Sequence, residues 1–162
     1  MRAVLQRVKQ ASVHVDGKLV SSIGPGILAL IGVSQEDTPE QIDTLVRKML
    51  TIRLWPEGAL ANGAASSGPE TRLWRANVAE FGGEILCVSQ FTLHAKLKGT
   101  RPDFHAAMGG EQARVFYDAI LSKLQKEYIA DKIQDGEFGA MMDVALINDG
   151  PVTIALDTLE KK

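Results

Sequence analysis

The sequence has 162 residues, of which 45% are hydrophobic and 23% charged, and its net charge is −2. This composition predicts one soluble globular domain over residues 1–162 and excludes a nucleic-acid binder held by charge alone, although not a local basic patch. The single cysteine, Cys87, excludes an internal disulfide and a cysteine-cluster metal site. No stretch reaches the ~18 consecutive apolar residues of a membrane span, and the first residues lack a signal-peptide pattern, so we expect a cytoplasmic protein.

The first third of the chain predicts strands followed by a helix. Asp16-Gly17 is a strong two-residue hairpin signal, and the uninterrupted apolar run 27–33 is typical of a strand covered on both faces. Thr38 can cap a helix, with Gln41 completing a capping box. The expected elements are strands 2–9, 11–15 and 19–23, the central strand 27–33, a helix that buries Ile42, Leu45, Val46 and Met49, and a short strand 52–55.

Residues 57–75 are small and polar, without periodicity, and predict an exposed insertion that Trp74 anchors to the body. Further along, the expected elements are a strand 84–93, a basic loop 94–102, a helical turn 104–108, a helix 111–126 that buries Ala113, Phe116, Ile120 and Leu124, and strands 129–133, 141–147 and 152–156. This order predicts an α/β fold: a β-rich mixed sheet or small barrel with two main helices packed outside.

Most catalytic patterns are missing. His14, His94 and His105 lie at no metal-ligand spacing. Ser89 lacks the Gly-x-Ser-x-Gly turn of serine hydrolases, and no glycine-rich loop opens a helix to cradle phosphate. We therefore expect neither a metal nor a cofactor.

Two motifs remain. Ser89-Gln90-Phe91-Thr92-Leu93 ends an apolar strand, and small polar side chains with free backbone N–H groups there suit a developing oxyanion. A strand that surfaces into a basic turn explains the same pattern. Asn148-Asp149-Gly150-Pro151 separates two apolar, β-branched runs and predicts a break with an unusual backbone conformation.

In combination these stretches resemble the D-aminoacyl-tRNA deacylase family, essentially end to end. The insertion 57–75 is longer than is typical of the family. Met141-Met142 replaces the more usual acidic residue plus Met, which leaves Met142 at the matching position. The resemblance rests on Met1-Arg2-Ala3-Val4-Leu5-Gln6-Arg7-Val8, Ser89-Gln90-Phe91-Thr92-Leu93, Gly99-Thr100-Arg101-Pro102-Asp103-Phe104 and Asn148-Asp149-Gly150-Pro151-Val152-Thr153.

The resemblance implies a homodimer that hydrolyses the ester between a D-amino acid and the 3′-terminal adenosine of tRNA. It implies that the Gly150-Pro151 bond is cis and faces Ser89 to Thr92 of the other subunit. Its carbonyls would then hold the substrate ammonium group and leave no room for an L side chain. A filter that works by clash cannot reject glycine, so we expect glycyl-tRNA to be hydrolysed as well.

The resemblance also implies chemistry assisted by the 2′-OH of the tRNA, and no general base stands near Thr92 in the sequence. Thr92 is therefore interpreted as positioning the substrate, while backbone N–H groups bind the oxyanion. The candidate residues are Ser89, Gln90, Phe91 and Thr92 for catalysis, and Gly150, Pro151, Arg7 and Met142 for substrate binding. Arg7 matches a position that supports the Gly-Pro clamp, with a solvated edge-strand arginine as the plainer alternative.

Lys96, Lys98 and Arg101 form a local basic patch that would meet tRNA phosphates, unless they are only a solvated charged loop. Three other functions stay open: an editing enzyme with a trans Gly-Pro bond that acts on L-alanyl-tRNA, a non-catalytic tRNA- or DNA-binding module, and a structural dimer without a site.

Overall fold

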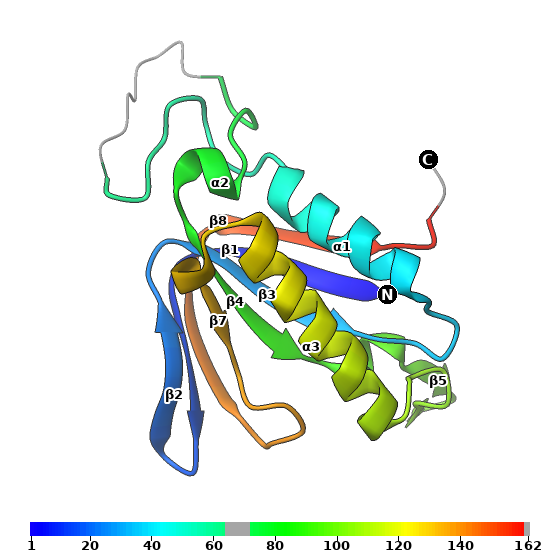
Figure 1. Cartoon of the computed structure of the whole chain (residues 1–162). Coiled ribbons are helices and arrows are strands. Elements are labelled where there is room, and N and C mark those ends of the chain that lie inside the picture. Colours follow the sequence, from blue (N-terminus) through cyan, green and yellow to red (C-terminus); the bar gives the residue numbers. More distant parts are fainter. Residues whose placement is uncertain (64–71, 161–162) are drawn as a thin grey trace.

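The computed structural model describes residues 1–63 and 72–160. Its centre is a mixed sheet in the order β2-β1-β3-β4-β7, with β8 paired to β1 (Figure 1). β3–β4 and β4–β7 are parallel, while every pair that involves β1 is antiparallel. The strands are β1 Arg2–Val15, β2 Lys18–Ile23, β3 Gly26–Gly32, β4 Glu84–Ser89, β7 Ile133–Asp135 and β8 Asp143–Asp157. The prediction of a β-rich mixed sheet is confirmed.

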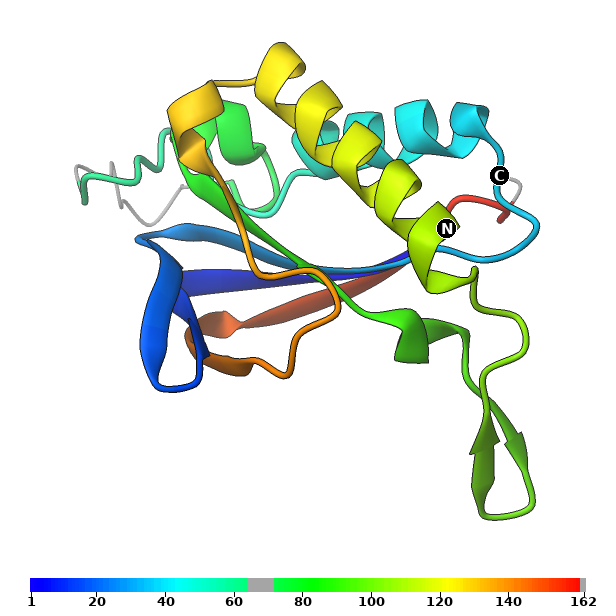
Figure 2. The same ribbon diagram turned by 60° about the horizontal axis from the view of Figure 1, so that its bottom comes forward.

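The two main helices, α1 (Pro39–Thr51) and α3 (Gly110–Glu127), lie on one face of the sheet, with the short α2 (Val78–Phe81) beside them (Figure 2). The predicted capping box of α1 is present, because the Thr38 N–H donates to Gln41 Oε1 at 2.7 Å. α1 buries Ile42, Leu45, Val46 and Met49, as its periodicity predicts. Burial of such a side chain stabilises the fold by about 1.5–3 kcal/mol. Among the helices of the described residues, none has the length and apolarity needed to span a bilayer.

The inward face of α3 differs from the prediction by one residue. Tyr117 is buried where Phe116 was expected, and Phe116 is half-buried. The Tyr117 hydroxyl donates to Asp135 Oδ1 at 2.5 Å, and burial raises the pKa of this phenol. A tyrosine can be buried here because β7 supplies the acceptor for its hydroxyl.

Several predicted boundaries were wrong. The strand 84–93 ends at Ser89 and continues as a 3₁₀ helix, η1 (Phe91–His94). The basic loop 94–102 contains a hairpin, β5 (Lys96–Lys98) and β6 (Arg101–Asp103). Residues 52–55 form only a Trp55–Ala76 bridge, 104–108 form a turn rather than a helix, and 129–133 hold the 3₁₀ helix η2 (Ala130–Lys132). The short helix α2 was not predicted.

The Asn148-Asp149-Gly150-Pro151 break is not a turn between two strands. β8 runs through it, but the pairing with β1 is interrupted: Val8 pairs with Asn148 and Arg7 with Val152, so Asp149, Gly150 and Pro151 bulge out of the ladder. The Gly150-Pro151 bond is cis, and Gly150 has φ +125°. The motif therefore lies within a continuous strand and is exposed there.

The α-ammonium group of Met1 is buried and forms an ion pair with Asp37, which is also buried. It further donates to Thr158 Oγ1 at 2.7 Å, and the Thr158 N–H donates to the Met1 carbonyl at 2.9 Å. These contacts join β1, the loop before α1 and the segment after β8.

The predicted insertion 57–75 lies partly outside the described residues, since 64–71 are not described. Within 57–63, Ala59 and Ala61 pack against the core. The prediction that Trp74 anchors this segment to the body is wrong, because the Trp74 side chain is 52% exposed. Trp55 is 3% exposed instead, and its ring stacks on Phe81 at 4.4 Å.

Candidate active site

The segment Ser89 to Thr92 leaves the sheet at the carboxyl end of β4. The Gln90 N–H makes the last contact with β3, to the Ile31 carbonyl at 2.7 Å, and η1 then begins at Phe91. η1 can pack this closely only because Gly32 has no side chain: a Cβ there would lie 2.8 Å from the Gln90 carbonyl oxygen. Sequence and packing together thus fix the point at which the chain turns.

Two amide groups at this turn are left without acceptors. Among the described residues, the N–H groups of Phe91 and Thr92 have no hydrogen-bond acceptor. The first N–H groups of any helix lack partners within the helix, and Phe91 and Thr92 are the first two residues of η1. Two adjacent free donors at an exposed strand end are the arrangement that stabilises an oxyanion.

Thr92 is exposed, and its hydroxyl accepts a hydrogen bond from the Gln90 side-chain amide. A carboxamide cannot take up a proton, so this contact orients the hydroxyl without activating it as a nucleophile. In the part of the chain that the structure describes, no carboxylate or imidazole is hydrogen-bonded to the Thr92 hydroxyl.

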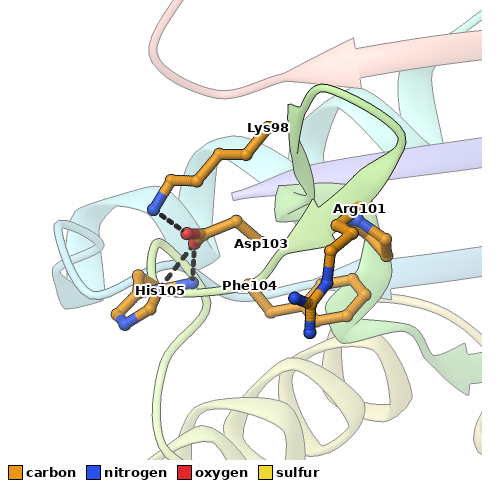
Figure 3. A pocket seen from close by; sticks show the side chains of 6 residues that line it. Lys98, Arg101, Asp103, Phe104 and His105 are labelled. Carbon is orange, nitrogen blue, oxygen red and sulfur yellow. Dashed lines mark hydrogen bonds and ion pairs between the residues drawn. The ribbon is translucent and has the colours of Figure 1, made fainter.

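A hollow adjoins this turn. The Phe91 ring, 57% exposed, meets Phe104 edge-on with centroids 5.0 Å apart. Phe104 lines a cavity of about 650 Å³ with Arg101 and His105 of the segment that carries β6 (Figure 3). Aromatic rings beside a hollow suit a nucleobase at a single-stranded end.

Two residues of the basic patch, Lys98 and Arg101, line the same cavity. Lys98 forms an ion pair with Asp103, and His105 Nδ1 lies 2.6 Å from the same carboxylate (Figure 3). The Lys98 ammonium group and the His105 contacts hold the pKa of Asp103 well below its usual range. Lys96 and Arg101 are exposed and have no ion-pair partner among the described residues. The structure thus places all three predicted cations on the projecting hairpin.

Arg7 holds the other motif. Its Nε donates to the Asp149 carbonyl at 3.2 Å and lies 3.0 Å from Asp149 Oδ2, and its Nη1 donates to the Leu54 carbonyl. A Cβ on Gly150 would lie 3.4 Å from Arg7 Nη2. The plainer interpretation, a solvated edge-strand arginine, is wrong, since this guanidinium group is largely buried and bound on two sides.

A single chain does not bring its two motifs together. Arg7 pairs with Ile27, whereas Ser89 pairs with Ile31, four residues or about 13 Å further along β3. Gly150-Pro151 lies on β8, which is separated from β4 by β1 and β3. Met142, by contrast, reaches the β4 side, because a Cβ on Gly136 would contact both its sulfur and Val88.

The sequence interpretation missed two supports of η1. Arg2 Nη1 donates to the Leu93 carbonyl at 3.0 Å while its Nε contacts Asp157. His94 is buried, with Nε2 3.1 Å from the Gly32 carbonyl. Of these two supports, only His94 could have been suspected from the sequence, because it is a histidine in a loop whose other polar residues are mostly basic. Among residues 1–63 and 72–160 no group of three or more histidine, cysteine or acidic side chains could hold a metal ion.

Comparison with known proteins assigns the family. The family model described as D-Tyr-tRNA(Tyr) deacylase matches residues 4–157. The chain belongs to this deacylase family. It is therefore a hydrolase, and the resemblance drawn from the motifs is confirmed.

Relatives match over nearly the whole chain. A D-aminoacyl-tRNA deacylase of Yarrowia lipolytica is 49% identical over 100% of both chains, and one of Drosophila melanogaster is 48% identical over 100% of this chain and 95% of its own. A solved structure titled "c-Myc DNA Unwinding Element Binding Protein" matches with a TM-score of 0.85 and 47% identity, covering 97% of this chain and 98% of its own. A "probable eukaryotic D-amino acid tRNA deacylase", 17% identical with a TM-score of 0.76 over 96% and 97%, shares the fold.

Proposed function

We propose that this protein hydrolyses the ester of D-aminoacyl-tRNA, and of glycyl-tRNA, to free amino acid and tRNA. The observation that carries the proposal is the pair of free N–H groups at Phe91 and Thr92, exposed beside an aromatic cavity in a chain of the deacylase family. Relatives at 48–49% identity carry the name D-aminoacyl-tRNA deacylase.

In the proposed reaction a water molecule attacks the ester carbonyl carbon. The carbonyl oxygen gains negative charge in the tetrahedral intermediate and accepts hydrogen bonds from the two N–H groups. The bond between that carbon and the 3′-oxygen then breaks, and the 3′-oxygen takes a proton. The vicinal 2′-OH of the tRNA relays the proton lost by the water to this leaving oxygen, because Thr92 contacts no base. Ser89 and Gln90 position the turn.

The proposed site is composite: Gly150-Pro151 of one subunit faces Ser89 to Thr92 of the other in a homodimer. Three observations support this arrangement. The two motifs are far apart within one subunit, Gly150 and Pro151 are exposed, and Arg7 fixes the backbone before them. Met142 lines the substrate side near β4.

The Gly150-Pro151 backbone is the proposed chirality filter. It holds the substrate ammonium group and occupies the space that an L side chain would need, whereas a D side chain points away. Glycine has no side chain to exclude and therefore passes.

Lys96, Lys98 and Arg101 are proposed to contact phosphates of the tRNA acceptor end. Each phosphate contact adds to the salt dependence of binding. Lys98 contributes least, since Asp103 already pairs with it.

The deciding experiment compares hydrolysis of D-tyrosyl-, L-tyrosyl- and glycyl-tRNA by the purified protein. We expect rapid release of D-tyrosine and glycine and slow release of L-tyrosine. Equal rates for the D and L esters would contradict the proposed chirality filter. Absence of cleavage of all three esters would contradict the proposed deacylase activity. L-alanyl-tRNA belongs in the same series, because preferential cleavage of it would favour the alternative editing function.

A second candidate is a nucleic-acid-binding module without catalysis. It is favoured by the basic hairpin and by the solved structure that is 47% identical to this chain, whose name refers to a DNA element. Binding of tRNA or DNA by a protein that leaves all aminoacyl esters intact would support it.

A further inference from the structure

A second hollow, remote from the β5–β6 hairpin, carries an unused cluster of arginines. Arg53, Arg72 and Arg75 line a cavity of about 430 Å³ together with Glu57, Glu80 and Ala76. All three arginines are exposed, and within the described residues none of their guanidinium groups has an ion-pair or hydrogen-bond partner. The Glu80 carboxylate already accepts from the Asn77 N–H at 2.8 Å in the cap of α2. The cavity therefore offers three free fork-shaped donors to an anion.

Backbone hydrogen bonds hold Ala76, which lines the cavity, and an exposed tryptophan, Trp74, directly precedes Arg75 in the chain. The Leu54 and Trp55 N–H groups both donate to the Ala76 carbonyl, at 3.0 and 3.1 Å, and the Trp55 ring stacks on Phe81. Trp74, between two of the arginines, is exposed and adopts φ +59°, a conformation that bulky residues rarely take. Guanidinium groups with an exposed indole match phosphates and bases of single-stranded RNA.

The segment that carries Arg53 of this cavity is tied to the Gly-Pro motif. Arg7 donates to the Leu54 carbonyl with one nitrogen and to the Asp149 carbonyl with another. Leu54 directly follows Arg53 in the chain. In Figure 2 the β5–β6 hairpin projects from the end of the molecule opposite α2. The arginine cavity and Gly150-Pro151 thus belong to one rigid corner.

We infer that this arginine cavity binds the single-stranded acceptor end of the tRNA whose ester lies on Ser89 to Thr92 of the other subunit. The inference rests on the proposed composite site. If Gly150-Pro151 contacts a substrate bound to the other subunit, the neighbouring cavity lies next to the same substrate. One subunit then binds the RNA through its β5–β6 hairpin, and its partner binds the same RNA through the arginine cavity. Phosphodiesters bind the guanidinium groups and an unpaired base stacks on Trp74.

The test compares two substrates: D-tyrosyl-tRNA, and D-tyrosyl-adenosine, which carries the ester but no acceptor end. The measured quantity is the ratio of kcat/KM for the tRNA to kcat/KM for the adenosine ester. We expect Arg72→Ala and Arg75→Ala each to lower this ratio by roughly 5- to 30-fold and to reduce the salt slope of tRNA binding by about 1. Trp74→Ala lowers the ratio without changing the salt slope. Glu57→Gln raises it.

Lys18→Ala is the matched control, since it removes an exposed cation at the β1–β2 turn, and we expect it to leave the ratio unchanged. If the arginine variants behave like Lys18→Ala, or lower both kcat/KM values equally, the inference is wrong while the proposed function stands. If the wild-type protein cleaves neither ester, the proposed function itself fails. Thermal melting of each variant confirms that it is folded.

Discussion

At the scale of single residues, the proposed chemistry depends on backbone groups that a few side chains hold in place. Arg7 binds the backbone before Gly150 from one side, and Gly32 allows η1 to approach β3. The side chain of Thr92, which looks like a nucleophile in the sequence, is bound to an amide that cannot activate it. Substitutions that move or remove a backbone N–H group should therefore cost more than loss of the Thr92 hydroxyl.

Phe91→Pro and Thr92→Ala test this ranking. Proline is tolerated at the first position of a helix, so Phe91→Pro removes one oxyanion donor at little cost in fold, and we expect kcat on D-tyrosyl-tRNA to fall about 10²- to 10³-fold. Phe91→Ala separates the loss of the ring from the loss of the N–H. Thr92→Ala should retain hydrolysis within about tenfold, because it deletes no donor of the pair. Abolished hydrolysis by Thr92→Ala with intact tRNA binding would make Thr92 the nucleophile after all.

Gly150→Ala tests the filter. A Cβ there would lie 2.9 Å from Val152 Cγ2 and 3.4 Å from Arg7 Nη2, at a φ of +125° that L residues rarely adopt. We expect a lower kcat/KM on D-tyrosyl-tRNA and a smaller ratio of D to L rates, because the Arg7 clamp must shift. Gly139→Ala is the control, since Gly139 also has a positive φ, +79°, but nothing lies within 4 Å of its Cβ position. Similar kinetics of the two variants would show that the Arg7 contact is irrelevant.

At the scale of elements, a buried ion pair joins the residue before β1 to the loop before α1, and hydrogen bonds to Thr158 join the same residue to the segment after β8. The Met1 ammonium group and the Asp37 carboxylate are both fully buried, and Asp37 also accepts from the Ser34 N–H at 2.7 Å. Removal of one partner of a buried pair leaves the other charge uncompensated. Exposed pairs such as Arg114–Asp118, on successive turns of α3, contribute little by comparison.

Asp37→Asn should therefore lower the free energy of unfolding by about 3–5 kcal/mol, measured by urea denaturation. Asp118→Asn, which removes the same charge from an exposed pair, should change it by less than about 1 kcal/mol. Equal effects of the two substitutions would contradict the structural role given to the Met1–Asp37 pair.

The centre of β4 offers a second test at this scale. Cys87 is fully buried between β3 and β7, and burial, with the nearby Asp135 charge, raises the pKa of its thiol. The thiolate is the reactive form, so we expect a disulfide reagent to label Cys87 only as fast as the protein unfolds. Rapid labelling in buffer at neutral pH, without denaturant, would show that β4 opens locally.

At the scale of the whole molecule, the proposed site needs two subunits, which makes mixed dimers informative. Phe91→Pro subunits keep Gly150-Pro151 intact, and Gly150→Ala subunits keep the η1 donors intact. A mixed dimer has one complete composite site and one that lacks both parts. We expect each variant alone to be less active than the wild-type protein, and the mixture, after subunit exchange, to exceed both variants and to reach up to half of the wild-type activity per mixed dimer.

The mixture also locates the arginine cavity. Arg75→Ala should impair the mixed dimer when it is added to the Phe91→Pro subunit, which supplies Gly150-Pro151, and not when it is added to the other. No recovery in any mixture whose mixed dimers are verified by mass would place the complete site within one subunit.

The sequence predicted those features that local rules determine. The Asp16-Gly17 turn, the capping box at Thr38 and the inward face of α1 follow from positions close in the chain, and each is present. The motif of residues 89–92 was identified as polar groups at a strand end, and its free N–H groups are there.

The rest depends on contacts between distant residues. Tyr117 replaces Phe116 inside because Asp135, eighteen residues away, accepts its hydroxyl. Arg7 could be tied to Leu54 and Asp149 only by the fold, since these partners are 47 and 142 residues away. Asn-Asp-Gly-Pro signals a turn in isolation, but pairing with β1 on both sides, at Asn148 and Val152, turns the motif into a bulge within β8.

The β5–β6 hairpin projects from the body (Figure 2), and this gives a readout by proteolysis that involves no reaction of the protein. Trypsin cuts after basic residues in exposed tips but poorly before proline, so Lys96 and Lys98 are the expected sites and Arg101, which precedes Pro102, is protected by its neighbour. An RNA gripped by the hairpin would shield both lysines. The rate of cleavage after Lys96 and Lys98, followed by the masses of the fragments, thus reports occupancy of the hairpin even for RNAs that carry no amino acid.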